Sequence, residues 1–159
     1  MNVLREPAVN YWHAREGNDF SSPQQGIFGP KVMIINEMAG SGGDWLPFAF
    51  RKLNIGPLVG TRTWGGLVGN YTTPNDALDG GYVATPDVAF YDLDGLWEVE
   101  NHGVEPDVRV EDDPKAEREG SDPQLERAIA VAMDLLGKGP TLRAPRHAPY
   151  PDYYNGARP

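Results

Sequence analysis

The chain has 159 residues, room for one domain with a sizeable core, and the composition of a globular protein rich in glycine, proline and aromatic residues. Its formal net charge of -9 argues against nucleic acid and anionic membranes as partners, and the absence of cysteine excludes disulfides and thiolate chemistry. No apolar run approaches the roughly 20 residues of a membrane span and no signal-peptide core is present, so we expect a cytoplasmic protein or a fragment of a larger one.

The first strand with a clear pattern is expected at residues 31–37. Before it, "AVNYWHARE" (8–16) is compatible with a short strand or a turn, and a polar loop follows. "KVMIINE" (31–37) is a continuous apolar run that ends in polar residues, which is typical of a strand buried on both faces.

A helix is predicted shortly after this strand, over "DWLPFAFRKL" (44–53). Asp44 favours the positive helix N-terminus, and Pro47 falls in the first turn, where a missing N–H costs little. "NIG" ends the helix, and "PLVGTRTWGG" (57–66) begins as another strand. Residues 31–62 are therefore expected to form strand–helix–strand, the crossover unit of a parallel sheet.

The middle of the chain is predicted to contain a β-hairpin. "GGYVATPDVAFYD" (80–92) and "LWEVEN" (96–101) flank "LDG", whose aspartate and glycine suit a tight turn. If the second segment is a strand, Glu100 and His102 share one face and resemble a carboxylate–imidazole pair. Same-face neighbours of this kind are also common by chance.

The C-terminal part of the chain contains the clearest helix. "VEPDVRV" (104–110) is a short extended stretch, and the acidic run after it is a solvated connector. Asp122 and Pro123 provide an N-cap and a first helical residue, and Gly137 ends the apolar face that follows. This face consists of Leu125, Ala128, Ile129, Ala132 and Leu136. The Pro- and Tyr-rich tail (140–159) has no periodicity. This is compatible with disorder, but its aromatic residues favour packing on a surface or a neighbouring subunit.

Ser41 is the candidate nucleophile. It lies in "NEMAGSGGDW" (36–45), between the predicted strand and helix. At such a junction the hydroxyl is held at the sheet edge, and the Gly42 N–H points out of the helix end, where it can bind an oxyanion. Glycines on both sides allow a tight turn and close approach of a substrate backbone. The alternative of a structural N-cap serine stays open, because "AGSGG" is not the strict G-x-S-x-G elbow.

A serine nucleophile needs a base within hydrogen-bonding reach. The chain offers three histidines. His102 is the candidate base because of its neighbour Glu100, whereas His13 lies beside a tryptophan and His147 lies in the tail. No spacing of His, Asp and Glu residues indicates a metal site, and no cofactor is expected.

Two longer stretches resemble a known family. "KVMIINEMAGSGGDWLPFAFRKLNIGPLVGTRTWGGLVG" and "LDGGYVATPDVAFYDLDGLWEVENHGVEPDV" are similar, in order and spacing, to the catalytic region of the tricorn protease group. This group belongs to the S41 family of tail-specific, carboxy-terminal-processing serine peptidases. The resemblance covers about residues 26–113 and reaches the helix that ends near Leu136.

The resemblance implies an α/β fold, namely part of the spiral β/α fold of the Clp protease and crotonase superfamily. A parallel-rich sheet would carry crossover helices and a β-hairpin. Position by position, Ser41 matches the nucleophile, the Gly42 N–H matches one oxyanion donor, and Glu100 matches the glutamate that orients the base through another serine. Six further residues are expected to flank the substrate cleft. These are Gly40, Gly43, Arg62, Trp64, Gly65 and Gly66. For the last four of them, the alternative is a structural turn with a packed tryptophan.

Gly66 marks a departure within the family. The processing proteases place a lysine base here, in "G-x-x-T-x-G-K", whereas "GTRTWGG" places glycine at this position. The resemblance therefore points to the tricorn branch, in which the base histidine and the second oxyanion donor lie upstream of this chain. We expect this chain to be part of a larger serine endopeptidase and to have little or no peptidase activity in isolation.

The expected organisation is a C-terminal portion of the peptidase catalytic domain at residues 1–139, followed by the tail at 140–159. The resemblance implies peptide or protein substrates and a homo-oligomer, with trimers that assemble into hexamers. In the tricorn group an acidic residue of a neighbouring subunit selects basic side chains. Asp19 and Glu16 lie in the corresponding region, but neither matches that residue. A non-catalytic peptide-binding or assembly module of the same fold is the alternative.

Overall fold

The computed structural model shows two compact units. One unit spans residues 30–139, and the other consists of residues 1–29 and the described residues after position 139. The residues that the structure describes are 1–70, 75–76, 79–139, 144–147 and 149. Among them, no helix is both long and apolar enough to cross a membrane.

The larger unit is built on a three-stranded parallel sheet. Its strands are β3 (Met33–Ile35), β4 (Leu58–Gly60) and β9 (Val108–Arg109), and β4 lies in the centre. Helix α2 (Gly42–Lys52) connects the first two strands, and every residue of β4 is buried. The predicted strand–helix–strand crossover is therefore confirmed, and the unit has the expected α/β architecture.

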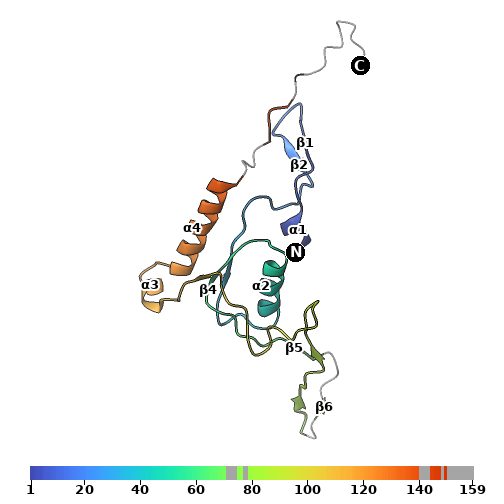
Figure 1. Cartoon of the computed structure of the whole chain (residues 1–159), viewed down its shortest axis with the longest axis vertical. Coiled ribbons are helices and arrows are strands. Elements are labelled where there is room, and N and C mark those ends of the chain that lie inside the picture. Colours follow the sequence, from blue (N-terminus) through green and yellow to red (C-terminus); the bar gives the residue numbers. More distant parts are fainter. Residues whose placement is uncertain (71–74, 77–78, 140–143, 148, 150–159) are drawn as a thin grey trace. The chain divides into compact units, whose positions relative to one another are not determined.

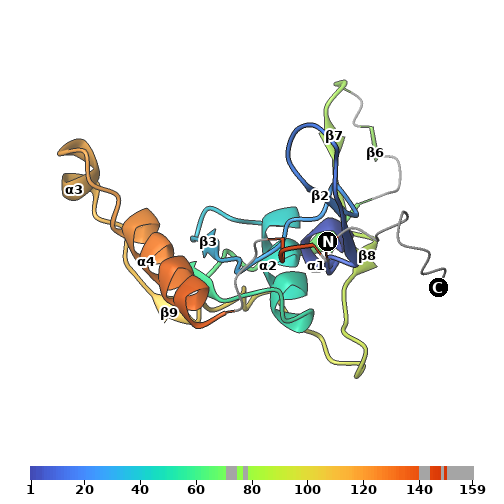
Figure 2. The same ribbon diagram turned by 90° about the horizontal axis from the view of Figure 1, so that it is seen from above.

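Two helices cover the sheet. Helix α4 (Pro123–Lys138) packs on β3 and β4, and Figures 1 and 2 show α2 on the other side of the sheet. The Asp122 carboxylate caps α4 by accepting a hydrogen bond from the Leu125 N–H at 2.8 Å. The helix continues one residue past its predicted end at Gly137, and Gly139 is its C-cap.

The predicted apolar face of α4 is only partly covered. Ala128 is buried, and so is Gln124 one turn before it, whose side chain donates to a backbone carbonyl just after β9. Leu125, Ile129 and Leu136 remain exposed. Because the sheet has only three short strands, it covers the side of α4 around Ala128 and leaves the neighbouring apolar side open.

The predicted hairpin around "LDG" is only a turn. Residues 96–101 form no strand, and β8 (Val88–Ala89) pairs antiparallel with β5 (Val68–Gly69) instead. A second antiparallel pair joins β6 (Asn75–Asp76) to β7 (Tyr82–Val83). The predicted pairing is wrong because β5 and β6 supply the partner strands.

The remaining elements are short. Helix α3 (Pro114–Arg118) lies in the acidic connector. In the smaller unit, α1 (Asn2–Arg5) precedes an antiparallel pair formed by β1 (Asn10–Trp12) and β2 (Phe20–Ser22). The predicted tail at 140–159 lies mostly outside the described residues.

The loop after β4 packs backbone against backbone on the turn at 99–104. Thr63 is fully buried, its N–H donates to the Val104 carbonyl (3.1 Å), and its hydroxyl accepts from the Val104 N–H (2.7 Å). Gly103 has a φ of +71°, and a Cβ at this position would lie 2.2 Å from the Thr63 carbonyl oxygen. Close contact between the two segments therefore needs glycine here.

Asp92 holds the turn that follows β8. Its carboxylate accepts hydrogen bonds from the N–H groups of Asp94 (2.9 Å) and Leu96 (3.0 Å). It also pairs with the Lys52 ammonium at 3.0 Å. The pKa of Asp92 lies below its ordinary value, first because of the Leu96 N–H and then because of the hydrogen bond from Lys52. The hydrogen bond to Asp92 is also the main reason that the pKa of Lys52 is raised.

We predict that Asp92→Asn lowers stability near neutral pH but not in acid. A carboxyl whose pKa is lowered by folding stabilises the fold above its ordinary pKa, and this contribution is lost as the pH falls through the folded-state pKa. The urea midpoint of the variant should lie below that of the parent chain near neutral pH, and the gap should narrow as the pH falls below the ordinary aspartate pKa of about 3.9. Asp134→Asn, at an exposed ion pair on α4, is the control. A gap of equal size at both pH values would contradict the role of the Asp92 carboxylate.

Candidate active site

Ser41 lies at the junction of a strand and a helix. It follows β3 and is the N-cap residue of α2. Its φ of 55° and ψ of -112° form a backbone conformation that is unusual for a residue with a side chain. Strain of this kind is characteristic of an elbow that turns a serine hydroxyl outward between a strand and a helix. Ser41 is exposed, as this geometry requires.

The buried carboxylate of Asp44 fixes this elbow. Asp44 is 0% exposed, and its side chain accepts a hydrogen bond from the Ser41 N–H at 2.9 Å. It also accepts from the N–H groups of Gly65 (2.8 Å) and Gly66 (3.0 Å). The Ser41 N–H reaches the Gly66 carbonyl as well, at 3.0 Å. Asp44 thus ties the elbow to the loop after β4, a role that its place near the helix N-terminus did not predict.

The elbow opens into a hollow of about 470 Å³. Gly42 is the first residue of α2, and no described residue accepts a hydrogen bond from its N–H. The rest of the wall comes from α2 and from the β5–β8 pair and is mainly apolar. It consists of Trp45, Leu67, Val68, Gly69, Val88, Ala89 and Phe90. A carbonyl group placed beside Ser41 would meet a hydroxyl and an unbonded N–H in an apolar setting, which suits stabilisation of an oxyanion.

Glu100 contacts the same loop. It is half-buried, and its carboxylate accepts a hydrogen bond from the Leu67 N–H. Leu67 directly follows Gly66, whose N–H is bound by Asp44 and whose carbonyl is bound by the Ser41 N–H. Two carboxylates therefore hold consecutive N–H groups of the segment that leads into the wall of the hollow.

His102 lines a different hollow from the candidate nucleophile. Residues 100–102 form a turn, and the residues Val99 and Asn101 have positive φ values of 74° and 61°. The prediction that Glu100 and His102 share one face of a strand is therefore wrong. The Nδ1 atom of His102 instead lies 2.8 Å from the Glu100 carbonyl oxygen.

The other two histidines belong to the smaller unit. The rings of His13 and His147 lie 4.3 Å apart, and Nδ1 of His13 lies 2.7 Å from a carboxylate oxygen of Asp19. Glu16 is exposed. Within the described parts of the chain, no group of three His, Asp or Glu side chains is arranged to hold a metal ion.

Of the residues predicted to flank the substrate cleft, the glycines and Trp64 lie around the elbow, whereas the Arg62 side chain contacts residues of the other hollow. Arg62 donates to the His102 carbonyl at 2.5 Å. The exposed Trp64 ring covers Gly40, where a Cβ would lie 2.5 Å from it. Among the described residues that line the Ser41 hollow, none of the six is present. They are Gly40, Gly43, Arg62, Trp64, Gly65 and Gly66. Their contact with substrate stays a prediction.

The apolar wall of the hollow was not predicted. It depends on the pairing of β5 with β8, in which Val68 lies opposite Ala89. The short apolar stretches "LVG" and "DVAF" are the local signal for these strands. Runs of this length do not specify their partner, so the sequence did not place them beside Ser41.

We predict that Asp44→Asn destabilises the chain by roughly 2–3 kcal/mol, because an amide presents one acceptor and brings two extra donors to a buried site with three N–H groups. Urea unfolding near neutral pH measures the loss, and amide hydrogen exchange at Gly65 and Gly66 should accelerate. Asp134→Asn on the exposed side of α4 should change neither quantity measurably. Unchanged exchange at both glycines would show that the carboxylate does not hold the loop.

The profile of Peptidase family S41 matches residues 4–110, more than half of the chain. The chain is 44% identical over 126 residues to "Tricorn protease homolog 1" of Streptomyces coelicolor, covering 79% of this chain and 12% of that protein. It is 40% identical over 136 residues to "Tricorn protease" of Thermoplasma acidophilum, covering 86% of this chain and 13% of that protein.

A solved structure agrees with these sequence matches. "Crystal structure of the tricorn protease" superposes with a TM-score of 0.75 at 41% identity, covering 84% of this chain and 13% of that chain. The chain spans only about an eighth of the length of the relatives that it matches. By the extent of the family match and the similarity of sequence and fold, this chain belongs to peptidase family S41 and is similar to the tricorn proteases.

Proposed function

We propose that this chain is the part of a tricorn-like serine endopeptidase core that carries the nucleophile Ser41 and the supporting Glu100. Membership of the S41 family supports peptide-bond hydrolysis as the reaction. The observation that carries the proposal is the exposed serine at a strained elbow with a φ of 55°, next to the unbonded N–H of Gly42.

The reaction follows from these groups. The Ser41 hydroxyl attacks the carbonyl carbon of a peptide, and its proton passes to a base. The carbonyl oxygen becomes an oxyanion, which the Gly42 N–H and the positive end of α2 stabilise. The C–N bond then breaks, the amine leaves with the proton from the base, and the acyl group stays on Ser41 as an ester. A water molecule activated by the same base hydrolyses this ester.

The base and the second oxyanion donor come, in this proposal, from a part of the protein outside this chain. Among the described residues, no histidine or lysine lines the Ser41 hollow. Gly66 occupies the position at which the processing proteases carry their lysine. Following the tricorn resemblance, Glu100 orients the base histidine through another serine.

The apolar wall supports peptides or proteins as substrates. Trp45, Leu67 and Phe90 offer contact area for an apolar side chain next to the cleaved bond. The complete enzyme is proposed to act in the cytoplasm. As the resemblance implies, it is also proposed to be a homo-oligomer, with trimers that assemble into hexamers.

A non-catalytic peptide-binding module is the second candidate. This candidate is favoured by the position of His102, the candidate base, which lines a separate hollow and not the one beside Ser41. In that case the hollow beside Ser41 would hold a peptide without cleaving it.

We predict that a fluorophosphonate probe labels Ser41 slowly in the isolated chain. In the longer protein, labelling should be faster by a factor of about 1,000 or more, because the missing base then activates the hydroxyl. Mass spectrometry of the intact protein and of its peptides measures the rate and the site. Ser41→Ala should abolish labelling, whereas Ser21→Ala should leave it unchanged. Failure of the longer protein to react would favour the non-catalytic module, and rapid labelling of the isolated chain would show that it contains its own base.

A further inference from the structure

The wall of the Ser41 hollow is attached to the helix that carries the candidate nucleophile. Ser41 caps the N-terminus of α2, and Phe90, which follows β8, lines the hollow. The ring of Phe90 packs edge-to-face against the ring of Phe48 on α2, with centroids 5.0 Å apart and planes at 85°. Phe48 therefore connects α2 directly to the part of the wall that follows β8.

A second contact between the same two segments lies one helical turn further along α2. The Lys52 ammonium pairs with the Asp92 carboxylate at 3.0 Å, and Asp92 is only 7% exposed. Glu98 is a more distant partner of the same ammonium, at 3.6 Å. The ammonium also lies 5.3 Å from the centroid of the Phe48 ring, within the range of a cation–π contact. The aromatic contact and the ion pair therefore support each other.

The spacing of the contacting residues matches on the two segments. Four residues of a helix span about 6 Å, and two residues of an extended chain span about 6–7 Å. Phe48 and Lys52 thus lie on one face of α2. Their separation matches that of Phe90 and Asp92, which follow β8. Tyr91, between these two, is 61% exposed, as the alternation of side chains along an extended segment requires.

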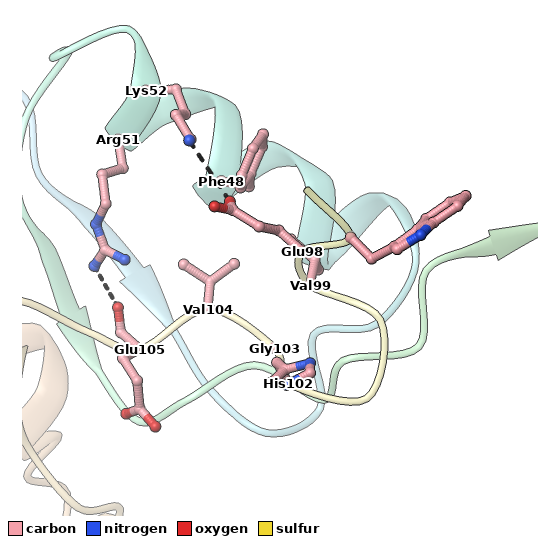
Figure 3. Close-up of a pocket in the computed structure, with 10 residues that line it drawn as sticks. Phe48, Arg51, Lys52, Glu98, Val99, His102, Gly103, Val104 and Glu105 are labelled. Carbon is pink, nitrogen blue, oxygen red and sulfur yellow. Dashed lines mark hydrogen bonds and ion pairs between the residues drawn. The ribbon is translucent and has the colours of Figure 1, made fainter. Parts of the chain in front are cut away.

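Phe48 also separates the Ser41 hollow from a second hollow. The second hollow lies beside Val104 and has a volume of about 450 Å³, and Phe48, Arg51 and Lys52 line it from α2 (Figure 3). It shares no lining residue with the Ser41 hollow. Because open space lies on one side of the Phe48 ring, this ring, rather than a packed core, limits how far Phe90 can move away from the Ser41 hollow.

We propose that Phe48 and Lys52 are positioning residues that set the width of the Ser41 hollow. They hold residues 90–92 against α2, so this part of the wall keeps a fixed distance from Ser41 at the start of the same helix. The width of the hollow in turn limits the size of the apolar side chain that it admits. This inference rests on the proposed function, in which the hollow receives a side chain of the bound peptide.

The test measures the binding of two capped peptides to the nitrogen-15-labelled chain. Acetyl-Gly-Phe-Gly-amide is compared with its analogue in which the wider naphthylalanine replaces phenylalanine. The amide signals of Val68, Gly69 and Ala89, which line the Ser41 hollow, report binding. Phe48→Ala should raise the affinity for the naphthylalanine peptide relative to the phenylalanine peptide by about fivefold or more, because Phe90 can then move into the vacated space. Phe48→Leu fills part of this space and should give a smaller rise.

Variants at the next turn of α2 test the ion pair and provide the control. Lys52→Met should raise the same affinity ratio, whereas Lys52→Arg can still pair with Asp92 and should leave it close to that of the parent chain. Arg51→Gln removes the neighbouring cation, which pairs with Asp107 instead, and should not change the ratio. An unchanged ratio in Phe48→Ala, an equal rise in Arg51→Gln, or no binding of either peptide at the Ser41 hollow would each overturn the proposal.

This test does not need catalysis, because the peptides are bound and not cleaved. Phe48→Ala should change the affinity ratio to the same extent when it is combined with Ser41→Ala. Failure of the fluorophosphonate probe to label Ser41 in the longer protein would count against the peptidase. The affinity ratio would still report the width of the hollow, so the two proposals can fail separately.

Discussion

The candidate active site depends on the carboxylate of Asp44. This one buried side chain accepts hydrogen bonds from the elbow at Ser41 and from the loop at Gly65 and Gly66. A buried carboxylate is tolerated only while its partners are in place, so the elbow and the loop cannot separate without a large cost in free energy. The unusual backbone of Ser41 is held by this contact, and the Gly42 N–H is left available as a result.

The loop after β4, which Asp44 binds at Gly65 and Gly66, is also bonded to other parts of the larger unit. Thr63 fixes it to Val104, and the Leu67 N–H is bound by the Glu100 carboxylate. These contacts give the Ser41 hollow and the hollow beside Val104 a common framework, although the two share no lining residue.

The sequence predicted the parts of the fold that depend on local pattern. The apolar run before Ser41 and the helix after it were recognisable because a strand buried on both faces and a capped helix each have a distinct signature. The segment at 96–101 was wrongly predicted as a strand, since nothing in its residue types signals the positive φ values of Val99 and Asn101. The wall of the hollow and the reach of Asp44 to Gly65 could not be predicted, because both depend on contacts between segments far apart in the chain.

A crystal structure of the chain at near-atomic resolution would show whether the contacts of Asp44 hold Ser41 as a nucleophile. We expect Ser41 to keep a φ near 55°, its hydroxyl to face the hollow walled by Leu67 and Phe90, and Asp44 to stay bonded to Gly65. A Ser41 backbone in an extended conformation, with its hydroxyl turned away from this hollow, would contradict this expectation. Ser41 would then be an ordinary helix cap.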